Sequence, residues 1–185
     1  MPLGPYGFPY LEQVERAMGT TVQKVERVVT DDLEEAWLAD LQSRLLRQQH
    51  LGVKTRVDVS SGLFCKSKES AEAISTLMQH CQRVDVFALF IEADIGTEGW
   101  AVLGKALSWG NVEWIISHKV QMASARREDQ KAIWEGVSTG WEVWLDEVQS
   151  ELFEDWNEFE KFLKAEEDAK ENEDEDGDED KEGQI

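Results

Sequence analysis

The side chains that most often do chemistry are few in this chain and lack the spacing that chemistry needs. His50, His80 and His118 lie far apart, whereas a metal site needs two ligands at fixed helical or strand spacing and a third nearby. Cys65 and Cys81 are too few for a disulfide framework or a four-thiolate zinc site. They indicate free thiols in a reducing compartment, so a cytoplasmic or nuclear location is expected. We predict no metal site and no cofactor.

Three short polar segments follow strand-like runs and are the best candidates for a catalytic edge. Ser60-Ser61-Gly62 stands where phosphate loops stand, but it lacks the lysine and glycine spacing of a P-loop. Residues 93–96 and 117–119 (Ala-Asp-Ile-Gly and Ser-His-Lys) occupy similar places. If the strands are adjacent and parallel, these loops converge, as in a small α/β enzyme or regulatory domain. No catalytic motif is present, so an enzyme is the alternative function and not the leading one.

The elements that must position these residues follow a repeat. Strand-like runs rich in β-branched and aromatic residues begin near Val22, Val53, Val84, Val112 and Trp141. Their start-to-start spacings are 31, 31, 28 and 29 residues. A constant period of this length is typical of repeat proteins, in which each unit covers its neighbour.

Amphipathic segments lie between the strand-like runs and predict half-buried helices. Their apolar positions are Leu38, Leu41 and Leu45; Ala71, Ile74, Leu77 and Met78; Trp100, Leu103, Ala106 and Leu107; Ile133, Gly136 and Val137; and Trp156, Phe159, Phe162 and Leu163. Predicted helix N-caps are Thr30, Ser67 and Thr97, and predicted helix ends are Gly52, Gly110 and Gly140. The chain is therefore predicted to be an α/β protein of about five βα units, a short solenoid with a parallel sheet and helices on one side. A small open doubly wound α/β layer is the alternative.

One unit carries a family resemblance. Ile95, Gly99, Leu103 and Leu107 fall at four-residue steps, a pattern that resembles the helical half of a leucine-rich repeat of the long, ribonuclease-inhibitor-like kind. The unit at 84–111 matches best, and the resemblance extends loosely over residues 20–165. It implies a curved horseshoe with the parallel sheet on its concave face. The strands depart from the family in being rich in Val and Trp, and the family's Asn after the strand is missing.

Alternation along the strands indicates which side chains face a partner. On the run at 53–59, Lys54, Arg56 and Asp58 point away from the valines, and Asp85 and Glu113 hold analogous positions in later units. Trp141 and Trp144 are separated by an odd number of residues, so one of them faces away from the other's layer and could be an exposed anchor. We predict a partner-binding set of Lys54, Arg56, Asp58, Asp85, Glu113, Trp141 and Trp144.

Charge divides the chain into parts. Residues 166–185 hold 12 acidic and 2 basic side chains and predict a disordered tail, either an arm for basic proteins or a solubilising extension. Residues 1–20 are read as a lead-in with a short helix, and residues 21–165 as the repeat domain, closed by a capping helix over 146–165. The net charge of −20 argues against nucleic-acid binding, and the absence of a long apolar run argues against a membrane span.

The leading functional prediction is a non-enzymatic protein–protein interaction module with an acidic tail. Repeats offer an extended surface in place of a convergent pocket. The expected partner is a protein, including basic proteins that the tail would attract, and the expected state is a monomer.

Overall fold

The computed structural model describes residues 25–48, 51 and 53–176, in which strands and helices alternate. The elements in order are β1 (Val25–Leu33), α2 (Glu35–Gln48), β2 (Lys54–Cys65), α3 (Lys68–His80), β3 (Arg83–Ile91), α4 (Gly96–Leu107), β4 (Asn111–His118), the 3₁₀ helix η1 (Lys119–Met122), α5 (Arg127–Glu135), β5 (Val137–Trp144), β6 (Ser150–Phe153) and α6 (Trp156–Asp176). The chain is therefore an α/β protein, as the sequence predicted.

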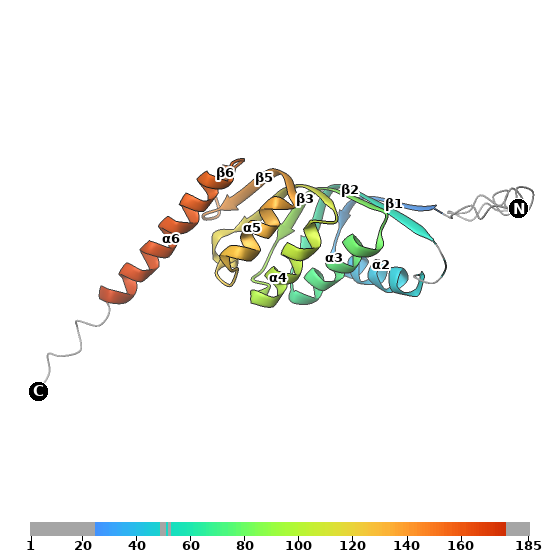
Figure 1. Cartoon of the computed structure of the whole chain (residues 1–185), viewed down its shortest axis with the longest axis horizontal. Helices are drawn as coiled ribbons and strands as arrows, with labels where there is room; N and C mark the ends of the chain where they lie inside the picture. Colours follow the sequence, from blue (N-terminus) through green and yellow to red (C-terminus); the bar gives the residue numbers. More distant parts are fainter. Residues whose placement is uncertain (1–24, 49–50, 52, 177–185) are drawn as a thin grey trace, which may run out of the picture.

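The strands form one six-stranded sheet in the order β1-β2-β3-β4-β5-β6, which is also their order in the sequence. Strands β1 to β5 are parallel, and β6 pairs antiparallel with β5. Helices α2 to α5 lie side by side on one face of the sheet, and α6 lies at the β6 end (Figure 1). A doubly wound layer requires a reversal of strand order and helices on both faces, and the described elements have neither.

The core lies between the sheet and this helix layer. Every second residue of a strand faces the helices, so Val57, Val59, Leu63 and Cys65 of β2 are buried. The predicted helical faces of α2, α3 and α4 are confirmed, whereas the set Ile133, Gly136 and Val137 is wrong beyond Ile133, because α5 ends at Glu135 and Val137 begins β5. The residues buried from the three confirmed faces are Leu38, Leu41 and Leu45 in α2; Ala71, Ile74, Leu77 and Met78 in α3; and Trp100, Leu103, Ala106 and Leu107 in α4.

Side-chain hydrogen bonds join residues about one repeat apart. Ser60 Oγ donates to Asp31 across 29 residues, and Ser67 Oγ donates to Glu35 across 32. Lys68 pairs with Glu98, 30 residues further along. Polar contacts of this kind link successive βα units.

Several predicted boundaries are wrong. Thr30 is not a helix cap, because β1 continues to Leu33, and Thr97 lies inside α4, whose N-cap is Ile95. Ser67 caps α3 as predicted and accepts from the Ser70 N–H at 3.1 Å. Helix α5 ends at Glu135 with Gly136 as its C-cap, so Gly140 lies within β5, which begins at Val137 and not near Trp141 as predicted.

The C-terminal part also differs from the prediction. Residues 146–153 form a turn and β6, because the Asp146 carboxylate accepts from the N–H groups of Val148 and Gln149 and reverses the chain. Helix α6 then runs through Asp176, so residues 166–176 of the predicted disordered tail are helical. The predicted lead-in at 1–20, the start of the first strand at Val22, His50, Gly52 and residues 177–185 lie outside the described residues.

Aromatic rings close the β6 end of the core. Phe159 of α6 is fully buried, and its ring centroid lies 4.9 Å from that of Trp141, 5.3 Å from that of Trp134 and 5.1 Å from that of Phe153. Trp141 in turn packs on Trp100 of α4, with centroids 6.1 Å apart. The first turns of α6 therefore cap the last strands, as the sequence predicted for a terminal helix.

Candidate binding surface

The sheet face opposite α2–α5 is called the open face here, because no helix of the described residues covers it (Figure 1). Its side chains alternate with the buried ones on each strand. In β2 they include Arg56, Asp58 and Phe64, which are exposed or half-buried. A surface lined by successive parallel strands can contact an extended partner along several units.

The N-terminal half of the open face holds a row of arginines. Arg27, Arg56 and Arg83 are register neighbours on β1, β2 and β3, and are called the arginine row below. With Asp58 and Asp85 they line a hollow of about 330 Å³. The hollow is formed by charged side chains alone, so it suits a polar or ionic group.

Two carboxylates hold the outer arginines. Arg27 pairs with Asp58 and Arg83 with Asp85, each at 2.5 Å, and Asn111 donates to Asp85 at 3.1 Å. Partial burial raises the pKa of Asp85, but the hydrogen bonds from Arg83 and Asn111 and the Arg83 charge outweigh it and leave the pKa below its usual value. Asp85 therefore stays ionised across the neutral range.

The C-terminal half of the open face holds an apolar stripe, defined as Phe64, Phe90, Trp114, Ile116 and Trp144. These side chains are all half-buried. The rings of Phe64 and Phe90 stack with centroids 5.0 Å apart and planes 13° apart. Trp114 has Ala88 and Gly140 as its register neighbours, so small residues flank its indole on both sides. The stripe offers aromatic surface that a partner could bury.

Gly62 sets the position of the two phenylalanine rings. A Cβ atom there would lie 2.8 Å from the Phe90 ring and 3.0 Å from the Phe64 ring. Both rings thus rest on the Gly62 backbone, at a point where β2 has an irregular register with β3.

Most of the predicted partner-binding residues lie on the open face, where they are exposed or half-buried. Lys54, Arg56 and Asp58 share the open face of β2, and Asp58 is the register neighbour of Asp85 on β3. Glu113 is exposed on β4. These five positions and Trp144 come from four strands but contribute to one sheet face.

The two tryptophans separate as their odd spacing predicted. Trp144 is half-buried on the open face, with its ring centroid 6.2 Å from that of His118. Trp141 is fully buried and donates its Nε1 hydrogen to Ser117 Oγ at 2.8 Å. Trp141 is therefore a core residue, and its inclusion in the binding set was wrong.

One of the three loops of the enzyme alternative does not lie at a strand end. Ser60–Gly62 lies inside β2, because the strand continues to Cys65. Asp94 accepts hydrogen bonds from Gly96 N–H, at 2.9 Å, and from Ser124 Oγ, so it joins its loop to the loop before α5. The hydrogen bonds of Asp94 therefore connect two neighbouring βα units.

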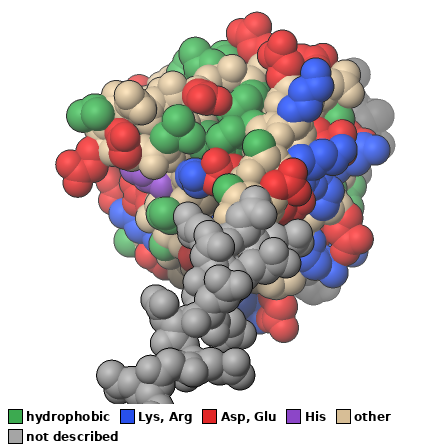
Figure 2. Space-filling view, turned by 90° about the vertical axis from the view of Figure 1, so that its left-hand side faces the viewer, with side chains coloured by type: hydrophobic (Ala, Val, Ile, Leu, Met, Phe, Trp, Pro, Cys, Tyr) green, Lys and Arg blue, Asp and Glu red, His purple; other side chains and the backbone are tan. Residues whose placement is uncertain are grey.

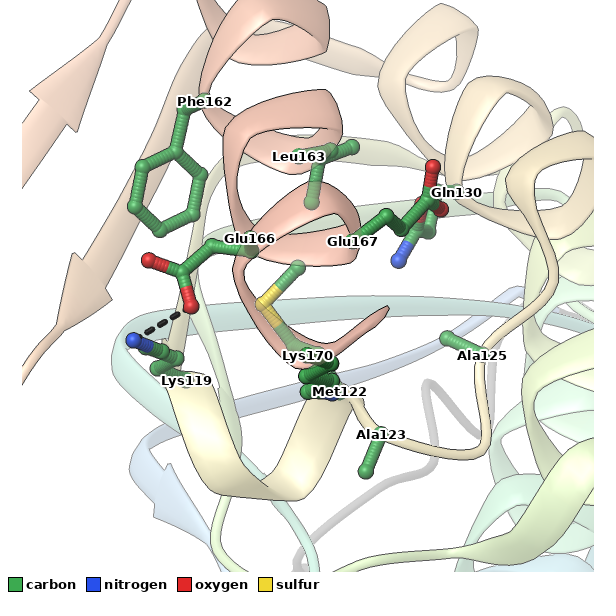
Figure 3. A pocket seen from close by; sticks show the side chains of 10 residues that line it. All are labelled: Lys119, Met122, Ala123, Ala125, Gln130, Phe162, Leu163, Glu166, Glu167 and Lys170. Atoms are coloured by element: carbon green, nitrogen blue, oxygen red, sulfur yellow. Dashed lines mark ion pairs between the residues drawn. The ribbon is translucent and has the colours of Figure 1, made fainter. Parts of the chain in front are cut away.

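A small groove lies between α6 and η1 on the other side of the molecule. It has a volume of about 120 Å³, and Met122 reaches toward α6 within it (Figure 3). Lys119 pairs with Glu166, and Arg127 with Glu167 at 2.9 Å. These ion pairs place basic side chains of neighbouring elements beside two acids of helix α6 that follow residue 165, where they offset part of the repulsion among its acids.

The β6 end of the molecule exposes hydrophobic side chains among acidic and basic ones (Figure 2). Val148, in the turn before β6, is 84% exposed and Leu152 of β6 is 62% exposed. They are scattered single residues, which are ordinary on a protein surface.

Metal and thiol chemistry find little support. Within the described ranges, no group of three or more His, Cys, Asp or Glu side chains could hold a metal ion. Cys65 and Cys81 are free, and burial raises the pKa of each thiol to about 12. Both thiols therefore remain protonated and poorly nucleophilic at neutral pH.

Sequence reasoning missed Arg27, Arg83, Phe64 and Phe90. A period search could have found the first two, because Arg27 and Arg56 are 29 residues apart and Arg56 and Arg83 are 27 apart. Phe64 was missed because Ser60-Ser61-Gly62 has the composition of a strand end, whereas Phe90 lies within a predicted strand and its pairing with Phe64 shows only in the register of β2 and β3.

None of the helices in the described part of the chain is both long and apolar enough to cross a membrane. Comparison with known proteins gave no match: no family model, no curated protein and no solved structure is similar to this chain.

Proposed function

We propose that this chain is a non-enzymatic protein-interaction module, a short leucine-rich-repeat-like solenoid whose open face binds a polypeptide partner. The observation that carries the proposal is the open face itself. It places the arginine row beside the apolar stripe on a sheet surface that no described helix covers. Charged groups that orient a partner, next to aromatic groups that bury area, are the usual composition of a binding surface.

The solenoid part of the proposal is supported by order and spacing. Strand order follows the sequence, helices α2 to α5 pack in the same order, and side-chain hydrogen bonds recur about 30 residues apart. Each unit then contacts mainly its neighbours, which is the defining property of a repeat array.

Paired tryptophan variants test the binding face. Trp114 lies in the apolar stripe, whereas Trp109 is 48% exposed in the turn between α4 and β4. We expect Trp114→Ala to weaken partner capture about 30-fold, since truncating an interface anchor costs about 2 kcal/mol. Trp109→Ala should leave capture unchanged.

The full-length chain serves as bait, and cross-linking followed by mass spectrometry locates the contacts of each captured protein. Melting temperatures of both variants verify that they are folded. Captured proteins whose cross-links map to α2–α5, and whose binding is unaffected by Trp114→Ala, would show that the open face is not the binding surface.

A second contact is proposed for the acidic C-terminal segment, which would attract basic proteins. Its like charges remain exposed along α6, where Glu167 and Asp168 are among the exposed residues. Truncation after Asp176 retains the ion pairs of Glu166 and Glu167 and so preserves the α6 contacts. If capture of basic proteins is equal with and without residues 177–185, those last residues do not select partners.

A further inference from the structure

The arginine row holds more positive charges than there are carboxylates beside it to neutralise them. Arg27, Arg56 and Arg83 stand in register on three adjacent strands, and neighbouring strands lie about 4.8 Å apart. Like charges directly opposite one another destabilise a sheet unless counter-charges are close. Asp58 and Asp85 supply counter-charges to the two outer arginines.

The central arginine has no such partner. Arg56 donates to the Gln82 side-chain oxygen at 3.3 Å and makes no ion pair with any described residue. Lys54 lies two residues away on the same face of β2. Strands β1 to β3 therefore hold four cationic side chains and two carboxylates, Asp58 and Asp85, on this half of the open face, and the exposed Glu113 lies beyond them on β4.

We infer that the arginine row binds a carboxylate-rich segment of the protein partner, an inference that rests on the proposed function of the open face. A guanidinium presents a planar fork that matches a carboxylate in two parallel hydrogen bonds. The row spans about 10 Å, two strand spacings, and three or four residues of an extended chain cover that distance. A short run of Asp or Glu fits it.

The hollow presents both signs of charge to an anion. Asp58 and Asp85 line the same space as the arginines, so an incoming anion meets two fixed negative charges as well as three positive ones. A phosphate group carries nearly two charges at neutral pH and a carboxylate carries one, and the phosphoserine peptide below tests the choice between them. The apolar stripe lies further along the same strands, so the partner segment carries its acids next to apolar residues.

Fluorescence anisotropy with three labelled peptides tests the inference on the full-length protein. The peptides share one sequence, three glutamates followed by leucine and tryptophan residues, and differ only in having glutamine or phosphoserine in place of the glutamates. We expect the glutamate peptide to bind about tenfold more tightly than the glutamine peptide, a difference of about 1.4 kcal/mol. This difference should shrink as salt is added, because the row is exposed.

Arginine variants locate the contact. Arg56→Gln should weaken binding of the glutamate peptide about tenfold. Arg56→Lys keeps the charge but loses the planar guanidinium, so its affinity for this peptide should lie between those of the wild type and Arg56→Gln. Arg47→Gln is the matched control, because Arg47 is exposed on α2 and, among the described residues, its side chain donates only to the Ser43 carbonyl. Melting temperatures establish that all three variants fold.

Four results would overturn the inference: equal binding of the glutamate and glutamine peptides, no effect of Arg56→Gln, tighter binding of the phosphoserine peptide, or no binding of any peptide. The proposed function of the open face is tested separately. If the glutamine peptide binds as tightly as the glutamate peptide, and Trp114→Ala abolishes this binding, the preference for acidic residues is refuted while binding of a partner to the open face still stands.

Discussion

Phe159 offers a direct test of whether this fold behaves as an array of units. Its ring is fully buried among Trp134, Trp141 and Phe153 at the β6 end of the sheet. Phe159→Ala removes the side chain and leaves a cavity, which costs about 4 kcal/mol. For a chain of this length, that loss lowers the melting temperature by about 10 °C.

The position at which protection from hydrogen exchange is lost distinguishes a repeat array from a domain that unfolds as one cooperative unit. In a repeat array each unit depends mainly on its neighbours, so the loss should concentrate in β5, β6 and α6. Hydrogen exchange measured by mass spectrometry should show faster exchange there and unchanged protection in β1 to β3. Leu45→Ala is the reciprocal control, because Leu45 is buried in α2 at the opposite end. It should raise exchange in β1, α2 and β2 and spare β5.

An equal rise of exchange in β1 to β3 and in β5 after Phe159→Ala would refute this reasoning. The domain would then unfold as one cooperative unit, and the local dependence of neighbouring units would not describe its energetics. A stability loss below about 1 kcal/mol would refute the assigned role of the ring cluster.

Three further predictions follow from particular contacts. Gly62→Ala should destabilise the fold by about 1–3 kcal/mol in urea unfolding, because its Cβ would lie 2.8 Å from the Phe90 ring; no loss would mean that the rings move aside freely. The lowered pKa of Asp85 stabilises the fold above the unfolded-state pKa of about 3.9, and the contribution is lost as pH falls through the lower folded-state value. Asp85→Asn should therefore lower stability at pH 7 and flatten the acid limb of the stability curve, and parallel pH curves for variant and wild type would contradict this. Ser117→Ala leaves the buried Trp141 indole N–H without its acceptor and should cost about 1–3 kcal/mol, whereas adding Trp141→Phe should cost less than the sum of the two single changes.

The sequence predicted the alternation of strands and helices and most of the buried helix faces well, because both depend on periodic apolar residues. Leu38, Leu41 and Leu45 face the sheet in α2 for the same reason that Leu103 and Leu107 do in α4. One strong local signal, Ser67 before α3, also held, since a helix cap depends on nearby atoms alone.

Strand lengths were predicted less well, because they depend on cross-strand partners. The Ser60-Ser61-Gly62 segment has the composition of a turn, yet it stays in the sheet: Gly62 N–H donates to Asp32 and Ser60 to Asp31 on the neighbouring strand. Both acceptors are about 30 residues away, beyond any local pattern. The same error hid Phe64, one of the five residues of the apolar stripe.

The position of Trp141 could not be read from the strand alone. Alternation showed that Trp141 and Trp144 face opposite sides, but which side is the core depends on Trp100 and Phe159, which pack against Trp141 from two helices. Charge gave a similar error in α6. The run of acids predicts disorder, but Lys119 and Arg127 from other elements pair with it.

The reversed direction of β6 gives the sheet two unlike ends. A further βα unit of the kind seen in β1 to β5 could not extend the array past β6, which runs antiparallel and is only four residues long. Strand β1 has nine residues and, among the described residues, pairs on one side only, with β2. Strands that join other chains do so at long free edges. We therefore expect aggregation of a destabilised variant to begin at β1. A designed extension by added βα units would also have to start from this edge, so the sheet can grow in one direction only.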